Sequence, residues 1–192
     1  MNQIKILVIL ILICFPLKAE NNVVTYGSNP KNTKINIKVF SSLTCPYCAE
    51  FHLKFLPTII KKYVTTEKVY IEIHDYPLDQ GGLIAAQLQK CFTLDQQKEY
   101  LDIIYKTQSK WSDANTLKEL RYNLYELSKM LGLEKKKFDG CLKNKNFESK
   151  VLKSRINAQN KYNISSTPTL IINEKKYKGS FKNIDKYIQK LM

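Results

Sequence analysis

Three short stretches of the chain carry the apolar patterns of β-strands. In residues 35–40 and 69–74 apolar side chains fall on alternate positions, so each stretch presents one apolar face. Residues 169–173 form a shorter run that is almost continuously apolar. Alternation with a period of two is typical of half-buried strands, and a short apolar run suits a buried one. We expect residues 176–179 to pair with the third strand as a hairpin.

A helical pattern follows the first strand. Phe51, Phe55, Ile59 and Tyr63 recur at helical spacing, which places them on one face of a helix. Pro57 lies inside this run, and an internal proline removes a hydrogen bond and crowds the preceding turn. The helix is therefore predicted to kink or split just before Pro57.

The long region between the second and third strands is predicted to be helical almost throughout, from residue 82 to about residue 162. Its clearest feature is an apolar stripe of five leucines: Leu117, Leu120, Leu124, Leu127 and Leu131. Such a stripe is usually a buried helix face, and Gly132 after it suits a helix C-terminus. A last helix is expected at residues 183–191.

The order strand, helix, strand, helical block, strand pair, helix predicts an α/β fold with a small mixed sheet. Residues 20–34 are polar and contain Gly27 and Pro30, so we expect a short lead-in there rather than a domain. Residues 20–192 have the length of one ordinary domain.

The N-terminus has the pattern of an export signal. Lys5 precedes an aliphatic run over residues 6–13, and Ala19 offers a cleavage site. The apolar run is shorter than the roughly 20 residues of a membrane-spanning helix. We therefore expect residues 1–19 to be a signal peptide, with an uncleaved membrane anchor as the alternative. Export to the bacterial periplasm would place the mature chain where thiols are readily oxidised.

Cys45, Pro46, Tyr47 and Cys48 form a Cys-x-x-Cys motif where the first strand meets the first helix. This placement is typical of a thiol–disulfide redox site. Pro46 suits the first helical position, because the N–H that it lacks would be unpaired there. Cys45 is then expected at the helix N-terminus, where free N–H groups and the helix dipole favour a thiolate. Cys48, one turn later, would be shielded and able to attack a mixed disulfide at Cys45.

Two other interpretations of the motif stay open: an inert disulfide and half of a zinc site. Four cysteines lie outside residues 1–19, which is enough for a tetrahedral site. However, Cys91 and Cys141 are far apart and form no second Cys-x-x-Cys. We therefore favour the redox interpretation and expect no metal site.

The formal net charge is +14, and of 31 basic residues only Arg121 and Arg155 are arginines. Proteins that read bases and phosphates rely on the arginine fork. Single-strand binders interleave basic and aromatic residues, and no such run occurs. No nucleic-acid partner is expected, although the charge favours acidic partners or an anionic membrane surface.

A second motif, Ser166-Thr167-Pro168-Thr169, precedes the third strand. A proline in that place is commonly a turn or an edge position, but its combination with the early Cys-x-x-Cys is informative. Residues 40–52 resemble the active-site segment of the DsbA family of exported thiol:disulfide oxidoreductases. Similar later segments follow in the same order: Leu56-Pro57, residues 75–79, Cys141-Leu142, residues 166–169 and Gly179.

The resemblance covers about residues 35–190 and implies a thioredoxin-like mixed sheet with an inserted all-helical domain at about residues 80–147. It implies that Cys45 exchanges with the substrate and that Cys48 resolves the mixed disulfide. The residues implied to contact the substrate are Pro46, Tyr47, Thr167 and Pro168. The Thr167–Pro168 peptide is expected to be cis and to face the cysteines, with a trans turn as the alternative.

The implied activity is the introduction of disulfides into unfolded or folding exported proteins that carry free cysteines. No cofactor is expected, and a quinone-linked membrane partner would reoxidise the cysteine pair. A disulfide isomerase or reductase that uses the same pair is the alternative. A non-enzymatic zinc-binding module that uses all four cysteines is a further alternative.

Two departures limit the resemblance. Tyr47 stands where the best-known members have histidine, so a cationic hydrogen-bond donor is absent. We therefore expect a reduction potential some tens of millivolts below that of the most strongly oxidising members. Val39 stands where some members carry a buried acid, so the resemblance assigns no proton-relaying carboxylate to that position in this chain. Glu50, Glu72 and His52 are candidates for such a role only because they are near in sequence.

Cys91 and Cys141 fall in the helical block, where one branch of the family carries a second disulfide. A bridge between them would close a loop of about 51 residues. By reducing the entropy of the unfolded chain, it would stabilise the fold by roughly 4 kcal/mol. The alternative is a pair of buried free thiols.

Overall fold

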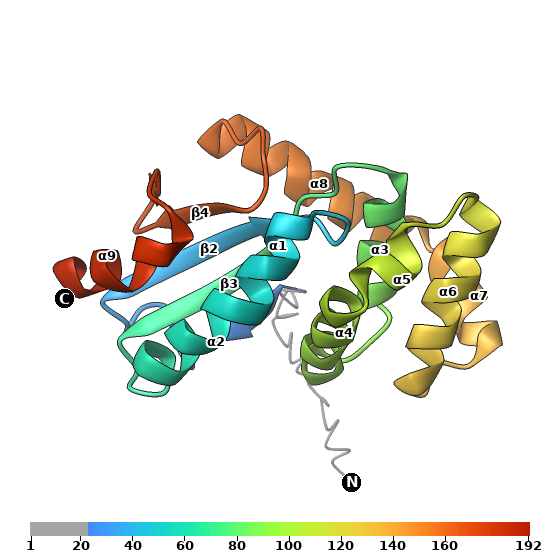
Figure 1. Cartoon of the computed structure of the whole chain (residues 1–192), viewed down its shortest axis with the longest axis horizontal. Helices are drawn as coiled ribbons and strands as arrows, with labels where there is room; N and C mark the ends of the chain where they lie inside the picture. Colours follow the sequence, from blue (N-terminus) through green and yellow to red (C-terminus); the bar gives the residue numbers. More distant parts are fainter. Residues whose placement is uncertain (1–22) are drawn as a thin grey trace, which may run out of the picture.

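The computed structural model describes residues 23–192, which form a mixed sheet covered by helices (Figure 1). The expected signal peptide at residues 1–19 lies outside the described residues. The sheet has five strands in the order β1-β3-β2-β4-β5. Their bounds are β1 Val24–Tyr26, β2 Ile35–Ser41, β3 Val69–Asp75, β4 Thr169–Ile172 and β5 Lys175–Lys176.

Strand β2 lies in the middle of the sheet and pairs in parallel with β3 and antiparallel with β4. The outer strands β1 and β5 are antiparallel to their neighbours. In the β2–β4 pair Phe40 stands opposite Thr169. This register brings the C-terminal end of β2 beside the start of β4, so the segments that carry the two sequence motifs meet at one end of the sheet.

The helical segment after β2 is continuous from residue 46 to residue 64. It consists of α1 (Pro46–Glu50), the π-helical turn η1 (Phe51–Phe55), α2 (Leu56–Ile59) and the π-helical turn η2 (Ile60–Val64). The change predicted before Pro57 takes the form of a π turn rather than a break, because the Leu56 N–H donates to the carbonyl of Phe51. A wider turn accommodates the proline without ending the helix.

Six helices connect β3 to β4: α3 (Gln80–Gln89), α4 (Leu94–Lys106), α5 (Gln108–Ser112), α6 (Leu117–Met130), α7 (Lys135–Lys143) and α8 (Lys145–Tyr162). The chain closes with the 3-10 turn η3 (Phe181–Asn183) and α9 (Ile184–Leu191). In Figure 1, α4 to α7 lie beyond the end of the sheet. Gly132 follows α6 with a φ of +80°, as its expected role at a helix C-terminus requires.

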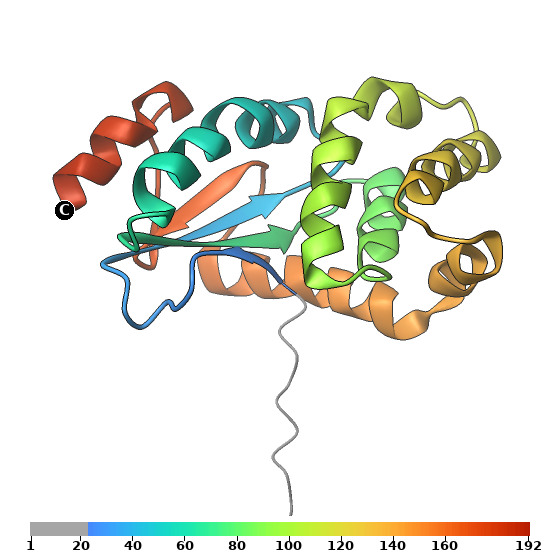
Figure 2. The same cartoon turned by 90° about the horizontal axis from the view of Figure 1, so that it is seen from below.

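The two faces of the sheet are covered by different helices. Figure 2 shows α1, α2 and α9 on one side of the strands and α8 on the other. The main core contains Ile37, Val39 and Ile71, whereas Phe40 packs with Ala158 of α8 in a second, smaller core. Phe40 shares the second face of β2 with Asn36 and Lys38, and α8 buries it there.

Two further sequence predictions are corrected. The lead-in at residues 20–34 contains β1, whose Val24 is buried and pairs with Ile73. The hairpin partner of β4 is Lys175–Lys176 rather than residues 176–179. Within residues 23–192, no helix combines the length and the apolar character needed to cross a membrane.

Candidate active site

Cys45 occupies the N-cap of α1, where the sequence placed it. Its backbone is extended, with φ −83° and ψ 120°, and Pro46 begins the helix. The backbone N–H groups of Cys48 and Ala49 both donate to the carbonyl of Cys45, at 3.0 and 3.1 Å. The Cys45 sulfur therefore lies at the positive end of the helical segment that runs to residue 64.

Cys48 lies one turn inside the helix and is fully buried, while Cys45 keeps a small exposed fraction of 6%. Both side chains are free thiols in this structure. Between them, Pro46 and Tyr47 are exposed, and Tyr47 is 70% accessible. This arrangement gives the two sulfur atoms unequal access to solvent, as expected for an attacking and a resolving cysteine.

The loop before β4 closes over the cysteines. The Thr167–Pro168 peptide is cis, which confirms the sequence prediction. The Sγ atom of Cys45 lies 3.4 Å from the carbonyl oxygen of Thr167. The Thr167 hydroxyl is buried in this loop. The first and second motifs therefore come together at one site.

The two thiols have opposite pKa shifts. Hydrogen bonding from Cys48 is the largest cause that lowers the pKa of Cys45, to about 5, and the Thr167 side chain and the helix N–H groups add to it against the effect of burial. Burial raises the pKa of Cys48 well above its ordinary value, and the neighbouring Cys45 raises it further. At neutral pH the pair is thus a Cys45 thiolate next to a Cys48 thiol.

Side chains from the helical region hold the loop that carries Cys45. Gln108 of α5 donates from Nε2 to the carbonyl oxygens of Leu43 at 2.7 Å and of Cys45 at 3.1 Å. Thr44 donates to Asp79, which also caps α3 by accepting from the Gly82 N–H. Sequence reasoning missed these contacts. Only the capping role of Asp79 leaves a local signal, as an acid just before a helix.

Glu50, Glu72 and His52, the candidates for a proton-relaying group, form their polar contacts with residues other than the two cysteines. His52 is buried, its ring packs at a tilt against Tyr105, and its Nε2 atom lies 2.7 Å from a carboxylate oxygen of Asp102, so its hydrogen bond does not run to a sulfur atom. Glu50 pairs with Lys54 along the helix surface. Glu72 lies on the α8 side of the sheet and pairs with His74. Val39 is itself buried in the main core.

Cys91 and Cys141 are joined by a disulfide, with Cα atoms 6.1 Å apart. The bridge ties the end of α3 to α7. Beside it, the Gln87 amide donates to the carbonyl of Cys141 at 2.9 Å. The four cysteines of residues 23–192 thus lie in two separate pairs, and no group of three or more metal-ligating His, Cys, Asp or Glu side chains occurs in this part of the chain.

A thiolate at a helix N-terminus, a shielded second thiol and a facing cis-proline loop on a mixed sheet define the thioredoxin-like class of dithiol proteins. The thioredoxin family model matches residues 19–190. The fold is similar to that of α-DsbA1 from Wolbachia pipientis, with 26% identity, a TM-score of 0.77, and 89% of this chain and 91% of that one covered. It is also similar in fold to Chlamydia trachomatis DsbA, with 22% identity, a TM-score of 0.69, and 92% and 94% covered.

Curated relatives come from Rickettsia. A Rickettsia typhi protein named as a protein-disulfide oxidoreductase is 30% identical over 126 residues, which are 65% of this chain and 45% of that protein. A similarly named Rickettsia prowazekii protein is 26% identical over 177 residues, 91% of this chain and 63% of that one. The chain spans about half the length of the curated relatives it matches. The chain belongs to the thioredoxin family, and its fold is similar to those of DsbA proteins. The predicted fold class, a thioredoxin-like mixed sheet with inserted helices, is confirmed.

Proposed function

We propose that this protein is a thiol:disulfide oxidoreductase that introduces disulfides into other proteins through Cys45 and Cys48. The observation that carries the proposal is the position of Cys45: its sulfur lies at a helix N-terminus, has a lowered pKa and meets the cis-proline loop. The names of the Rickettsia relatives and of the Wolbachia structure agree with this activity.

The proposed reaction begins with the oxidised Cys45–Cys48 disulfide. A substrate thiolate attacks the Cys45 sulfur, which is the more accessible of the two, and Cys48 leaves as a thiol after taking up a proton. A second substrate thiolate then attacks the substrate sulfur of the mixed disulfide and releases the Cys45 thiolate. The substrate gains a disulfide, and its two electrons remain on the reduced cysteine pair.

The direction of electron transfer, from the substrate to the cysteine pair, follows from the stability of the reduced pair. Lowering the pKa of Cys45 stabilises the thiolate that exists only in the reduced protein, so reduction becomes more favourable. A protein of this kind oxidises its substrates. The opposite direction, as an isomerase or reductase, requires a separate supply of electrons that keeps the pair reduced.

The substrate would bind across the surface beside Cys45. Pro46 and Tyr47 are exposed there, and Thr167 and Pro168 are half-buried on the facing loop. Tyr47 offers a large ring to an unfolded chain, while the loop offers backbone groups to an extended peptide. Such a site suits unfolded or folding proteins with free cysteines rather than one defined partner.

The proposal includes export to the bacterial periplasm and a quinone-linked membrane partner that takes the two electrons from the reduced pair. The bridge between Cys91 and Cys141 supports an oxidising compartment, because disulfides are rare in cytosolic proteins. We also propose the domain division 1–19 as signal peptide and 20–192 as one thioredoxin-like domain with a helical insertion at about residues 80–147.

The activity can be tested by the recovery of reduced, unfolded ribonuclease A in a glutathione buffer. The wild-type protein should accelerate recovery, and Cys45→Ser should abolish the acceleration. Cys48→Ser should accumulate a mixed disulfide between Cys45 and the substrate, visible as a mass increase that a reductant removes. Acceleration that persists in Cys45→Ser would disprove the proposed role.

A further inference from the structure

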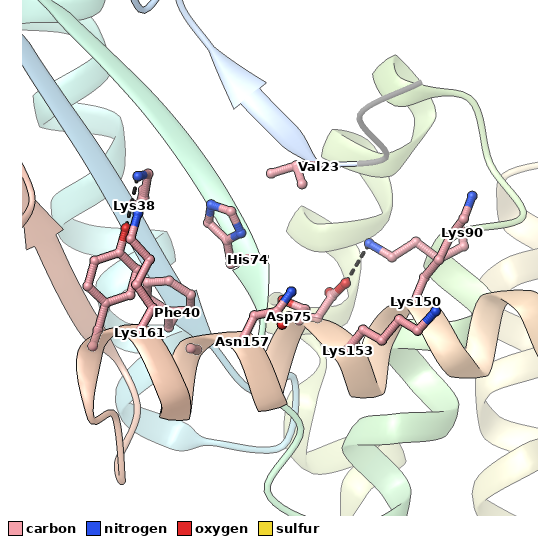
Figure 3. Close-up of a pocket in the computed structure, with 13 residues that line it drawn as sticks. Val23, Lys38, Phe40, His74, Asp75, Lys90, Lys150, Lys153, Asn157 and Lys161 are labelled. Carbon is pink, nitrogen blue, oxygen red and sulfur yellow. Dashed lines mark hydrogen bonds and ion pairs between the residues drawn. The ribbon is translucent and has the colours of Figure 1, made fainter. Parts of the chain in front are cut away.

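A second concave site lies on the face of the sheet that α8 covers. Its cavity measures about 420 Å³, within the range of roughly 300–1,000 Å³ that is typical of small-molecule sites. Strands β2 and β3 contribute Phe40 and His74, and α8 contributes Lys150, Lys153 and Asn157 (Figure 3).

This cavity is separate from the dithiol site. Side chains of β2 alternate between the two faces, so that Val39 belongs to the core that includes Cys45 and Cys48, whereas Phe40 points toward α8. Neither cysteine lines the cavity. A ligand bound there would therefore leave the substrate surface at Tyr47 free.

Five lysines and one acid line the cavity, so its charge is strongly positive. Three of the lysines are paired. Lys90 binds Asp75 at 2.6 Å, and Lys38 and Lys161 share Glu174. Lys150 and Lys153 form no ion pair within residues 23–192. Figure 3 shows both rising from α8 beside the Asp75–Lys90 pair.

The inner wall of the cavity is aromatic. Phe40 and His74 stack with ring centroids 4.9 Å apart, and Tyr162 lies against Phe40 at 5.7 Å. Ala158, a small residue, keeps the α8 side of the wall open. An apolar group would contact aromatic side chains here, whereas an inorganic anion such as phosphate would not cover them.

We propose that this cavity binds a small organic anion whose apolar, preferably aromatic, body packs on Phe40 and Tyr162 while its acidic group pairs with Lys150 and Lys153. The acidic group can be a carboxylate, sulfonate or phosphate, because the lysine ammonium groups recognise charge rather than shape. The concave form between a helix and a sheet suits a single soluble molecule, not a membrane surface.

Three probes separate the parts of this proposal. The first, 2-naphthoate, has both the aromatic body and the charge. The second, 2-naphthol, has the body without the charge at pH 7, and inorganic phosphate has the charge without the body. Binding is followed by two-dimensional ¹H–¹⁵N NMR, since a ligand of this size binds with a dissociation constant of about 1 mM. Naphthoate should shift the amide signals of Phe40, Asn157 and Ala158 saturably, and bind at least about tenfold more tightly than either other probe.

Exposed lysines make matched variants possible without damage to the core. The double variant Lys150→Gln/Lys153→Gln should weaken naphthoate binding by at least about tenfold. Lys136→Gln/Lys137→Gln removes the same charge from exposed positions of α7 and should leave binding unchanged. Asn157→Trp, which fills the opening and keeps all the lysines, should also abolish binding. Ribonuclease recovery should be unaffected in all three variants, so that loss of this site is distinguishable from loss of the proposed exchange activity.

The remaining outcomes would overturn the proposal. Equal binding of naphthoate and naphthol would remove the role of the charge, and equal binding of phosphate would remove the role of the aromatic wall. Absence of saturable naphthoate binding, or unchanged binding by the Lys150/Lys153 variant, would rule out the site. Co-sedimentation with phosphatidylglycerol vesicles that the same variant loses would assign the lysines to a membrane surface instead.

Discussion

The Cys45 sulfur lies 3.4 Å from the carbonyl oxygen of Thr167, a residue 122 positions later in the chain. The contact exists because β2 and β4 are antiparallel neighbours and each carries its motif at the same end of the sheet. It places Cys45 beside the cis-proline loop, whose Thr167 side chain contributes to the lowered pKa of Cys45.

The first prediction concerns the ionisation of Cys45. Its alkylation by iodoacetamide should follow a thiolate pKa of about 5, against about 8.5 for an ordinary thiol. The rate should be measured between pH 3 and 9 in Cys48→Ala and in the reduced wild-type protein. Because hydrogen bonding from Cys48 is the largest cause of the lowered pKa, and alanine cannot donate a hydrogen bond, the Cys48→Ala midpoint should lie above that of the wild type. A wild-type midpoint near 8.5 would contradict the geometry described for Cys45.

The same pKa shift makes the stability of the reduced protein depend on pH. The pKa of Cys45 is lower in the folded state than in the unfolded state, so this stabilisation is complete above about pH 8.5 and is lost as pH falls toward 5. The disulfide form has no such group. In urea unfolding, the stability of the reduced protein relative to the oxidised protein should therefore rise from pH 5 to pH 8.5, and a constant difference would contradict the assignment.

The Thr167 hydroxyl is predicted to stabilise the Cys45 thiolate. Thr167→Val removes the hydroxyl and preserves the shape of the side chain, so the pKa of Cys45 should rise by about one unit, equivalent to about 1.4 kcal/mol. Thr167→Ser keeps the hydroxyl and is the matched control. The pH dependence of alkylation by iodoacetamide gives the pKa of Cys45 in each of the two variants. Equal midpoints in the valine and serine variants would show that the hydroxyl has no part in the ionisation.

Gln108 is predicted to support the loop that carries Cys45. Gln108→Ala leaves the Leu43 carbonyl without its donor and should cost about 1–3 kcal/mol of unfolding free energy. Gln159→Ala, on the exposed surface of α8, should change stability by less than about 0.5 kcal/mol. Urea denaturation of both variants measures the difference. If Gln108→Ala is as stable as the control, the two hydrogen bonds have no structural importance.

The bridge between Cys91 and Cys141 is predicted to stabilise the fold without taking part in exchange. The double variant Cys91→Ala/Cys141→Ala should lose roughly 4 kcal/mol, because the bridge spans a sequence separation of 50 and constrains the unfolded chain. Ribonuclease recovery should continue at the wild-type rate at a temperature where the variant is folded. Loss of activity by the folded variant would mean that the bridge contributes to the reaction.

The main strands and the position of Cys45 at the helix N-terminus could be predicted because each leaves a local pattern, whereas the cis peptide before Pro168 was implied by the resemblance to the DsbA family. Strand β1 could not, since its three residues lie in a polar segment and are fixed only by pairing with β3. Gln108 was missed for a similar reason. Nothing around it in the sequence distinguishes it from other surface glutamines, and its role appears only when α5 packs against the Cys45 loop.

The cavity under α8 also depends on tertiary packing. The alternation along β2 indicated one apolar face, and Phe40 lies on the other face. Helix α8 covers that face, buries Phe40 and leaves an open volume beside it. A periodic pattern shows which residues share a face, but it does not show which helix returns to cover that face.

The reduction potential of the Cys45–Cys48 pair is the most direct test of the central claim that this protein is an oxidant. The protein is equilibrated with glutathione buffers of graded ratio, quenched with acid, and alkylated so that mass separates the reduced from the oxidised form. A pKa of about 5 for Cys45, against about 3.5 for DsbA, predicts a potential some tens of millivolts below the value of about −120 mV for that oxidant. A potential at or below about −270 mV, the value for thioredoxin, would contradict the claim and favour a reductase.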